Sequence, residues 1–301
     1  MTLSVRNNVF RNENNYRSET ICNILSLSGG GSHGAFESGV VSNLTERGKT
    51  WNTFYGISAG SLNSLFLSRY RDQKEAAFYL KNIYSNLKNS DVYTFSISSL
   101  YKGKSLYDTK PLHNLVINEM SKTEFNYSIY PTYLGATSLN MAQLSLFSLE
   151  KVIDNELISK MVMASSAIPF LFPAIEVDAG DFYVDGGVKT DELIYEPSRN
   201  CDEIEMDMVL SYNPHDYIVY KTGWNFFSVI ERVIQIVYHG FNNRVVEAMG
   251  MCRGGITKKG NMNIYYPASN INVSLLDFTK GKELWKMGYE NYVMNRVPLC
   301  F

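Results

Sequence analysis

The chain has 301 residues, of which 45% are hydrophobic and 19% are charged, a composition typical of a folded globular protein and not of a disordered one. Its length allows one large α/β domain or two small ones. The formal net charge of -2 creates no basic field that would recruit nucleic acid, so we expect no nucleic-acid partner. No stretch of about 18 uncharged apolar residues is present, so no transmembrane segment is predicted.

The first 20 residues and the cysteines bear on location and cofactors. Residues 1–20 are polar and rich in Asn, without the apolar core of a secretory signal, and we expect a flexible arm there. The four cysteines, Cys22, Cys201, Cys252 and Cys300, form no CxxC pair and have no histidine at metal-ligand spacing, so we predict no metal and no cofactor. Scattered cysteines in a chain of this length fit reduced, buried thiols in an intracellular protein, soluble or peripherally bound to a membrane.

The first elements in chain order alternate between strand and helix. Residues 23–28 predict a short buried strand, and a glycine-rich turn follows over 29–34. Residues 35–47 have helical spacing, and their apolar stripe consists of Phe36, Val40, Val41 and Leu44. A second strand over 53–56 leads into a helix over 59–70. This order is typical of a doubly wound α/β/α layer with a mostly parallel central sheet.

The remaining elements continue this alternation. Helices are predicted over 73–88, 108–120, 154–164 and 282–294, and strands over 132–137, 143–148, 175–177, 182–184, 207–211 and 263–266. Two segments are less regular: 89–107, expected to be a flexible cap, and 226–249, expected to be rich in helix with a mostly buried amphipathic helix over 226–238. We predict one domain over 21–301, with a motif-bearing core over about 22–215 and a C-terminal helical extension over about 216–301.

The stretch Gly56-Ile57-Ser58-Ala59-Gly60 lies at a predicted strand-to-helix junction. It has the pattern of a nucleophile elbow, in which a serine projects from a strained turn. Bulk at Gly56 or Gly60 would block the close approach of strand and helix. A turn of small residues without chemistry is the alternative, and nucleophilic acyl chemistry is the leading hypothesis.

The glycine-rich turn, with Gly29, Gly30, Gly31 and Gly34, precedes the elbow. Consecutive glycines let backbone N–H groups point at an oxyanion beside a helix N-terminus, which is what acyl transfer needs. The same glycines match a dinucleotide-binding fingerprint. That fingerprint requires a carboxylate at the end of the second strand, where this chain has Tyr55-Gly56, so nucleotide binding is the weaker alternative.

A serine nucleophile also needs a base. The chain has four histidines. His215 and His239 follow the serine in the order of an ordinary Ser-His-Asp esterase, whereas His33 lies in the glycine-rich turn and His113 on a predicted helix. Asp185 ends a predicted strand and is followed by Gly186 and Gly187. A carboxylate on such a turn acts as a base when it lies within hydrogen-bond reach of the serine, and a turn-capping Asp is the alternative.

Together these motifs resemble the patatin-like phospholipase family. The glycine turn, the elbow and the Asp185-Gly186-Gly187 triplet occur in the family's order and at compatible spacing, and the resemblance covers about residues 22–215. It implies a patatin-like α/β/α fold and a dyad of Ser58 as nucleophile and Asp185 as base, with an oxyanion hole at Gly29, Gly30 and Gly31. It also implies hydrolysis of fatty acyl esters in phospholipids or related lipids, through an acyl-serine intermediate, at a membrane or micelle interface and without metal.

Two residues depart from the family's pattern, and two other functions stay open. His33 stands where many members carry Arg or Lys, and Ser28 precedes the glycines in place of an acid. A neutral imidazole at residue 33 is expected to weaken positive charge beside the oxyanion hole. The alternatives are a conventional triad esterase that uses His215 or His239, and a catalytically silent lipid-binding or interaction protein on the same scaffold.

Overall fold

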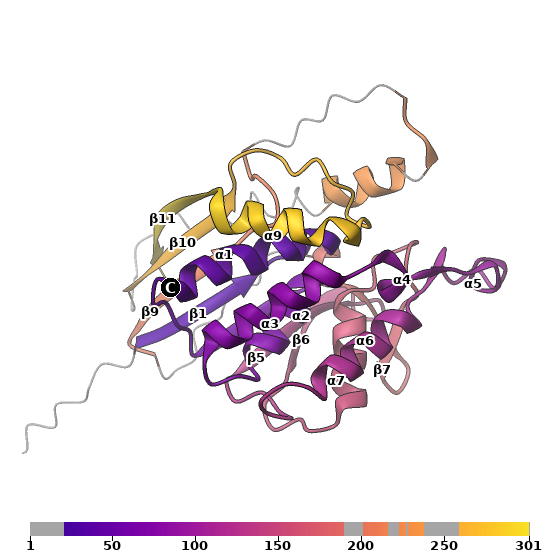
Figure 1. Cartoon of the computed structure of the whole chain (residues 1–301). Coiled ribbons are helices and arrows are strands. Elements are labelled where there is room, and N and C mark those ends of the chain that lie inside the picture. Colours follow the sequence, from indigo (N-terminus) through magenta and orange to yellow (C-terminus); the bar gives the residue numbers. More distant parts are fainter. Residues whose placement is uncertain (1–20, 190–200, 216–222, 227, 238–258, 301) are drawn as a thin grey trace, which may run out of the picture.

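The computed structural model describes residues 21–189, 201–215, 223–226, 228–237 and 259–300, so the predicted arm over 1–20 lies outside it. A 9-stranded sheet forms the centre of the described part, and helices pack against it (Figure 1). Most of its strands run parallel. The predicted fold class, a mostly parallel sheet flanked by helices, is confirmed.

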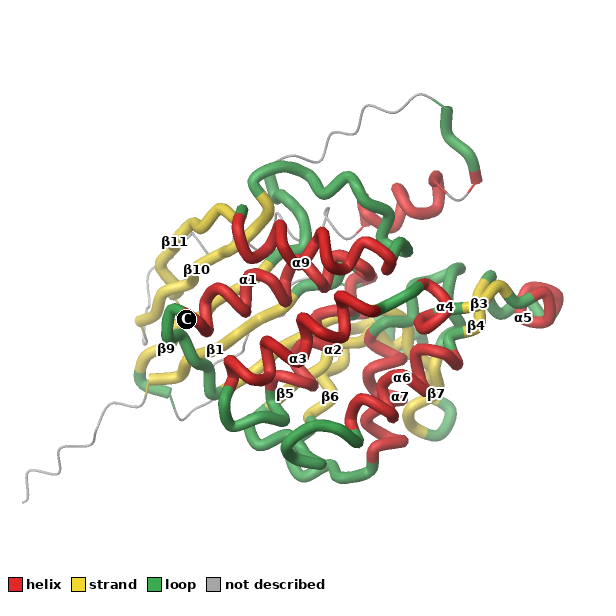
Figure 2. Tube along the Cα trace, in the orientation of Figure 1, coloured by secondary structure: helices red, strands yellow, loops and turns green. Residues whose placement is uncertain are grey.

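The strand order of the sheet is β11-β10-β9-β1-β2-β5-β8-β7, with β6 also paired to β5 (Figure 2). The strands are β1 (Ile21–Leu27), β2 (Thr53–Ile57), β5 (Thr132–Ser138), β6 (Gln143–Ser148), β7 (Ile175–Asp178), β8 (Asp181–Asp185), β9 (Glu203–Val209), β10 (Lys259–Pro267) and β11 (Tyr292–Cys300). Pairing is parallel from β10 through β9, β1 and β2 to β5. The carboxyl ends of these strands therefore meet at one edge of the sheet, where α/β proteins place their sites.

The helices stand close to their predicted positions. They are α1 (Gly34–Glu46), α2 (Ala59–Leu67), α3 (Gln73–Asn86), α6 (Lys110–Met120), α7 (Asn155–Ser165) and α9 (Gly281–Glu290), with 3-10 turns η1 (Gly31–His33), η2 (Gly186–Val188) and η3 (Phe278–Lys280). Local chemistry explains several starts. The Asp72 carboxylate accepts the N–H of Lys74 at the start of α3, and Asp154 caps α7 in the same way.

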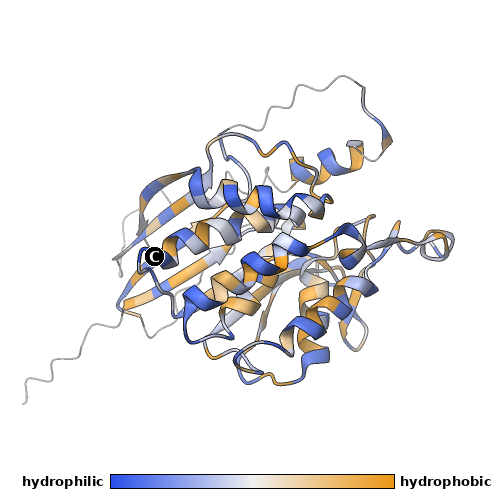
Figure 3. Ribbon diagram, in the orientation of Figure 1, coloured by the Kyte–Doolittle hydropathy of each residue, from blue (hydrophilic) through white to orange (hydrophobic). Residues whose placement is uncertain are grey.

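Alternation along the strands buries both faces of the sheet. Ile24 and Leu25 are neighbours on β1 and are both fully buried, yet they belong to different apolar clusters on opposite faces. Phe54 and Tyr55 on β2 divide in the same way. The stripe predicted on the first helix is buried in the cluster that also holds Leu25, and Figure 3 shows the mixed apolar and polar faces of these helices. Near-continuous apolar strands are typical of a parallel sheet with both faces packed.

Residues 89–107, expected to be a flexible cap, have regular structure. They form α4 (Asn89–Val92), β3 (Thr94–Phe95) and α5 (Ile97–Tyr101), and β3 pairs antiparallel with β4 (Tyr107–Asp108). Figure 1 shows α5 projecting at the end of the molecule far from β10 and β11. These elements are too short for a hydrophobic period to show in the sequence, which explains why the sequence did not predict them.

The C-terminal segment differs from the prediction. Residues 216–301 were expected to be a helical extension, but their described part supplies β10 and β11 to the central sheet as well as α9. The last helix ends at Glu290, and residues 292–294 belong to β11 rather than to the helix. As an edge strand, β11 tolerates Pro298 and mixed polarity, which is why its pattern does not identify it.

Residues 228–237 are helical, and the other parts of the predicted helix-rich segment after 237 lie outside the described residues. Ile234 is buried, but Val229, Val233 and Ile236 are each about half exposed. The helix is amphipathic as predicted, with Glu231, Arg232 and Gln235 on its polar side, but half of its apolar face is exposed, so the expectation that it is mostly buried is wrong. No helix in the described ranges has the length and apolar character needed to cross a bilayer.

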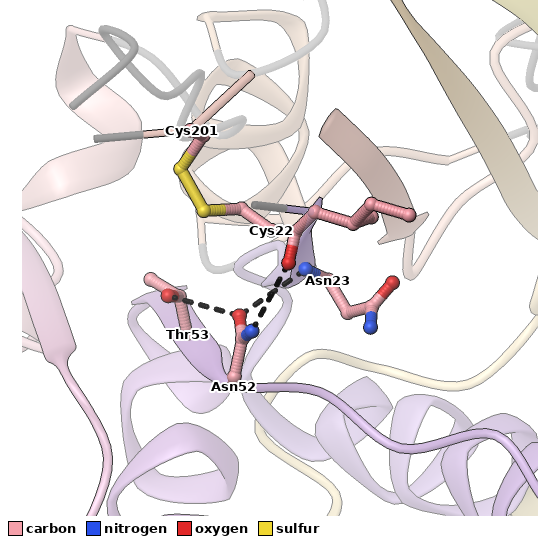
Figure 4. The surroundings of a disulfide bond; sticks show 6 residues. Cys22, Asn23, Asn52, Thr53 and Cys201 are labelled. Atoms are coloured by element: carbon pink, nitrogen blue, oxygen red, sulfur yellow. Dashed lines mark hydrogen bonds between the residues drawn. A yellow bond between two sulfur atoms is a disulfide. The ribbon is translucent and has the colours of Figure 1, made fainter. Parts of the chain in front are cut away.

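Two cysteines form a disulfide, which contradicts the expectation of reduced thiols. Cys22 on β1 is bonded to Cys201, which lies two residues before β9, and the two Cα atoms are 5.8 Å apart (Figure 4). The parallel pairing of β1 with β9 places Cys22 opposite Ile204 and so brings the cysteines together. Nothing in a separation of 179 residues reveals that pairing, and the cysteines give no support to an intracellular location.

We expect the double variant Cys22→Ser, Cys201→Ser to unfold about 2–4 kcal/mol more easily than the wild type, because the bond constrains a long loop of the unfolded chain. Thermal or denaturant unfolding in the presence and absence of a reductant measures this. The reductant should lower the unfolding temperature of the wild type and leave the double variant unchanged. An unchanged wild type would contradict the prediction.

Candidate active site

Ser58 occupies a strained turn between β2 and α2. Its φ of 52° and ψ of -121° are rare for a residue with a side chain and cost on the order of 1–3 kcal/mol. The surroundings hold this conformation. The Ser58 N–H donates to Ser165 Oγ over 2.9 Å, and the Ser58 carbonyl accepts from the N–H and the hydroxyl of Ser61 over 2.9 and 2.6 Å. The strained, over-determined serine has the geometry that a nucleophile elbow requires.

The positions of Gly56 and Gly60, on either side of Ser58, leave no room for a side chain. A Cβ on Gly56 would collide with the Gly60 carbonyl, and a Cβ on Gly60 would collide with the Leu27 carbonyl on β1. Strand and helix therefore approach as closely as the sequence pattern predicted. A Cβ on Gly34 would likewise meet Ala59 on α2, which is how the first helix packs against the elbow.

The strand register brings Ser58 and Asp185 to the same point of the sheet. A strand has two edges, and β6 pairs along one edge of β5 over its length. Strands β2 and β8 must therefore follow one another along the other edge, where Ile57 lies opposite Gly135 and Asp185 lies opposite Ala136. Since Ser58 follows Ile57, the chain turns away into α2 just where Asp185 begins.

Contacts around this junction agree with the register. A Cβ on Gly186 would lie 3.1 Å from the Ile57 side chain and 2.5 Å from the Gly135 carbonyl, so the turn after Asp185 packs against the end of β2. Asp185 is fully buried, its Oδ1 accepts the N–H of Gly187 over 2.9 Å, and its own N–H donates to the Ala167 carbonyl over 2.9 Å.

Ser165, at the end of α7, connects the elbow to the sheet. Its hydroxyl accepts the Ser58 N–H and donates to the Gly135 carbonyl over 2.7 Å. One side chain therefore fixes the nucleophile's backbone relative to β5. Ser165 lies outside the three motifs by which the site was predicted from the sequence.

The glycine-rich turn leaves donors available beside Ser58. Gly31 has a φ of 55°, which favours glycine, and it lines the same pocket as Ser58. Within the described part of the chain neither the Gly30 N–H nor the Gly31 N–H donates a hydrogen bond. The two N–H groups that follow do: that of Ser32 donates to the Leu275 carbonyl and that of His33 to the Gly30 carbonyl. The Gly29 carbonyl accepts from the Ser28 and Ser211 hydroxyls, and Gly29 does not line the pocket, so its place in the oxyanion hole stays a prediction.

A strap of residues 273–275 holds this turn from outside. The Val273 carbonyl lies 2.8 Å from His33 Nε2, and the Ser274 and Leu275 carbonyls each accept a bond from Ser32, both at 2.8 Å. Burial lowers the pKa of His33, although the contact with Val273 and the nearby Glu231 raise it in part. The imidazole is therefore neutral near pH 7, as expected for this position.

A buried carboxylate supports the turn from inside. Glu37 on α1 is fully buried and accepts from the Ser28 hydroxyl over 2.8 Å and from the Asn63 amide over 3.1 Å. Tyr84 in turn donates to Asn63 over 2.9 Å. The network ties α1, α2 and α3 to the end of β1. A glutamate beside the apolar stripe of the first helix was the available sequence signal, and it was missed.

An apolar pocket begins at Ser58. Gly31, Ala59 and Ser166 adjoin the serine, and the rest of the wall is almost wholly hydrocarbon, formed by Leu62, Phe66, Leu80, Ile83, Tyr84, Leu87, Val92, Leu112, Leu115, Ile168, Phe172, Leu276 and Phe278. The walls come mainly from α2, α3, α6 and the loop after α7. Such a lining fits a fatty acyl chain or a similar apolar group.

Of the two histidines proposed for a triad, His239 is outside the described residues. His215 is exposed and packs edge-on against Tyr266, and His113 contacts Glu156 over 3.0 Å. Neither lines the pocket that contains Ser58. Among the residues that the structure describes, no group of three His, Cys, Asp or Glu side chains could hold a metal ion.

The described residues thus combine an α/β fold with a strained serine, a glycine turn beside it and an apolar pocket. The model of the patatin-like phospholipase family matches residues 25–194, and the chain belongs to this family. A curated relative, the probable lipid hydrolase 463L of Invertebrate iridescent virus 6, is 26% identical over 179 residues, which are 54% of this chain and 59% of the relative. The match thus spans about three fifths of the relative's length.

A solved structure is also similar. The crystal structure of VipD from Legionella pneumophila aligns with 92% of this chain and 68% of its own, at 12% identity and a TM-score of 0.39.

Ser165→Ala should lower the catalytic rate about tenfold or more, because it removes the hydrogen bonds that fix the elbow on β5. Steady-state hydrolysis of a soluble ester measures this. Ser159→Ala is the matched control, since Ser159 lies on the same helix, is equally buried and has no hydrogen-bond partner. Equal rates for the two variants would contradict the positioning role of Ser165.

Protonation of His33 should make stability pH-dependent. The unfolded imidazole takes up a proton near its ordinary pKa of 6.5, whereas the folded one resists, so the folded state loses stability as the pH falls below about 6.5. The slope is at most about 1.4 kcal/mol per pH unit for one group. Denaturant unfolding of the wild type and His33→Gln between about pH 7.5 and about pH 5.5 tests this. Parallel curves for the two proteins would contradict it.

Proposed function

We propose that this protein is a lipid acyl hydrolase, of the phospholipase A or carboxylic ester hydrolase type, that works through a Ser58–Asp185 dyad. Asp185 accepts the proton of the Ser58 hydroxyl as Oγ attacks the acyl carbonyl. The Gly30 and Gly31 amides stabilise the resulting oxyanion. The alcohol leaves with the proton from Asp185, and a water molecule, activated by the same carboxylate, then hydrolyses the acyl-serine.

The observation that carries this proposal is the shared edge of β5. The register places Asp185 where β2 ends and Ser58 leaves the sheet. Neither Asp185 nor any histidine among the described residues lines the pocket with Ser58, so the support for Asp185 as the base comes from the strand register.

The pocket supports a fatty acyl ester as the substrate. Apart from the hydroxyls of Ser58, Ser166 and Tyr84, the side chains of its wall offer hydrocarbon to an acyl chain and no charged group that would select a soluble, polar acid. The family is named for phospholipases and the viral relative for a lipid hydrolase, which agrees with a phospholipid or a related lipid at a membrane or micelle interface.

Ser58→Ala and Asp185→Asn should each lower ester hydrolysis at least about a thousandfold while leaving the fold intact, because each removes a member of one catalytic unit. The measurements are hydrolysis of a soluble short-chain ester and circular dichroism. Asp181→Asn is the matched control: Asp181 lies at the other end of β8 and accepts from the Ser138 hydroxyl, a bond that an amide oxygen also accepts. Near-full activity of Asp185→Asn would overturn the dyad.

Two other functions make predictions that distinguish them from the dyad. A conventional triad would show a large rate loss on replacement of His215 or His239 by Ala, and the exposure of His215 argues against it. A silent lipid-binding protein would bind lipid yet form no adduct with a fluorophosphonate, whereas the strained Ser58 is expected to be labelled.

A further inference from the structure

Five exposed apolar side chains lie on β3, on α5 and in the loop after α7. This mouth surface consists of Phe95, Ile97, Leu100, Tyr101 and Phe170, each between 49% and 92% exposed. Backbone hydrogen bonds join their segments: the Ser96 N–H donates to the Leu106 carbonyl over 3.1 Å, and the Leu106 N–H donates to the Phe170 carbonyl over 3.1 Å. The segments that carry these side chains therefore lie side by side, which distinguishes them from single, scattered exposures.

Phe170 is the most informative member of the mouth surface. Its φ of 69° lies in the left-handed region, where glycine or asparagine is favoured and a bulky side chain is strained. The ring is nevertheless 73% exposed. Phe170 thus adopts a strained backbone conformation, and burial of its ring does not offset the strain. We therefore expect its ring to have a role outside the folded monomer.

The mouth surface is continuous with the pocket. Phe95 packs edge-on against Tyr107, whose ring lies 6.4 Å from that of Phe172, centroid to centroid. Phe172 lines the pocket that begins at Ser58, and Phe170 is two residues away from it. Aromatic rings therefore connect the mouth surface to the pocket that begins at Ser58, and an apolar molecule moving between the two stays in contact with them.

The region carries an excess of positive charge. Residues 94–107 contain Lys102 and Lys104 and no carboxylate, and Asp108, which lies opposite Thr94, is paired with Lys110 at 4.0 Å. Neither lysine takes part in an ion pair within the described residues. Exposed apolar side chains next to uncompensated lysines complement a bilayer whose headgroups are anionic.

The helix over 228–237 adds a second apolar stripe next to the pocket's mouth. Ile230, Ile234 and Val237 pack against the cluster that contains Phe172, whereas Val229, Val233 and Ile236 recur at helical spacing on the open side. The two stripes are adjacent and form one broad apolar face, of which one half packs on the protein and the other half is open to an apolar medium.

We propose that the mouth surface is a docking site for anionic phospholipid membranes, with Phe170 and the apolar side chains of α5 inserted among the acyl chains and Lys102 and Lys104 at the headgroups. The proposal deepens the proposed lipid hydrolysis and rests on it, because it names the surface from which the substrate enters the pocket. It selects anionic bilayers over neutral ones.

Binding to vesicles of non-hydrolysable, ether-linked lipids tests this without interference from turnover. The full-length protein should bind vesicles containing ether-linked phosphatidylglycerol more tightly than vesicles of ether-linked phosphatidylcholine alone, and added salt should weaken the difference. Phe170→Asn should lower binding about tenfold. Lys102→Gln and Lys104→Gln should each lower it about fivefold, on the anionic vesicles only.

The controls separate membrane docking from folding and from catalysis. Phe170→Asn should keep or raise the unfolding temperature, because asparagine tolerates the left-handed conformation, and it should leave hydrolysis of a soluble short-chain ester unchanged. Phe78→Asn replaces a 61% exposed phenylalanine on α3 and should not alter vesicle binding.

Three outcomes are decisive. Equal vesicle binding by Phe170→Asn and Phe78→Asn would overturn the proposal. So would a wild-type protein that ignores vesicles and self-associates through Phe170, since the occupant would then be a second copy of the chain. A wild type that binds anionic vesicles but hydrolyses no ester would refute the proposed function while leaving the docking surface standing.

Discussion

The candidate site depends on the fact that a β-strand has only two edges. Strand β6 occupies one edge of β5, so β2 and β8 are forced to share the other, end to end. The chain after β2 has no further partner on that edge and must turn out of the sheet at Ser58. The strained turn and the arrival of Asp185 are two results of the same strand pairing, and neither residue needs a long loop to reach the other.

The glycine turn is rigid because it is held from two sides. Inside, the buried Glu37 accepts the Ser28 hydroxyl at the end of β1. Outside, the strap over 273–275 takes up the donors of Ser32 and His33, and its Leu275 N–H in turn donates to Glu231 over 2.6 Å. Amides that are fixed before the substrate arrives need no reorganisation when an oxyanion forms, which is the main source of electrostatic stabilisation in acyl transfer. The neutral His33 serves this arrangement through its hydrogen bond and not through charge.

The elements that line the pocket are also those that reach the surface around it. The end of α7 and the loop after it supply Ser165 to the elbow, Phe170 to the exterior and Phe172 to the pocket within eight residues. Positioning, enclosure and exposure are thus coupled in one short segment, whose backbone is irregular because Pro169 and Pro173 exclude a continued helix. A site that runs from an exposed apolar ring through an apolar pocket to the elbow suits a lipid substrate, which is apolar and held in an interface.

The sequence by itself determined what is local. Small residues at 56 and 60, consecutive glycines and the alternation of strand and helix periods carry their own steric reasons, so the elbow, the turn and the fold class were predictable within a few residues. Tertiary structure alone decided the rest: the edge shared by Ser58 and Asp185, the disulfide between Cys22 and Cys201, the edge strand β11 and the burial of Glu37. Each of these depends on which strands pair or which faces meet across long separations, and backbone pairing leaves no periodic mark on the side chains of either partner.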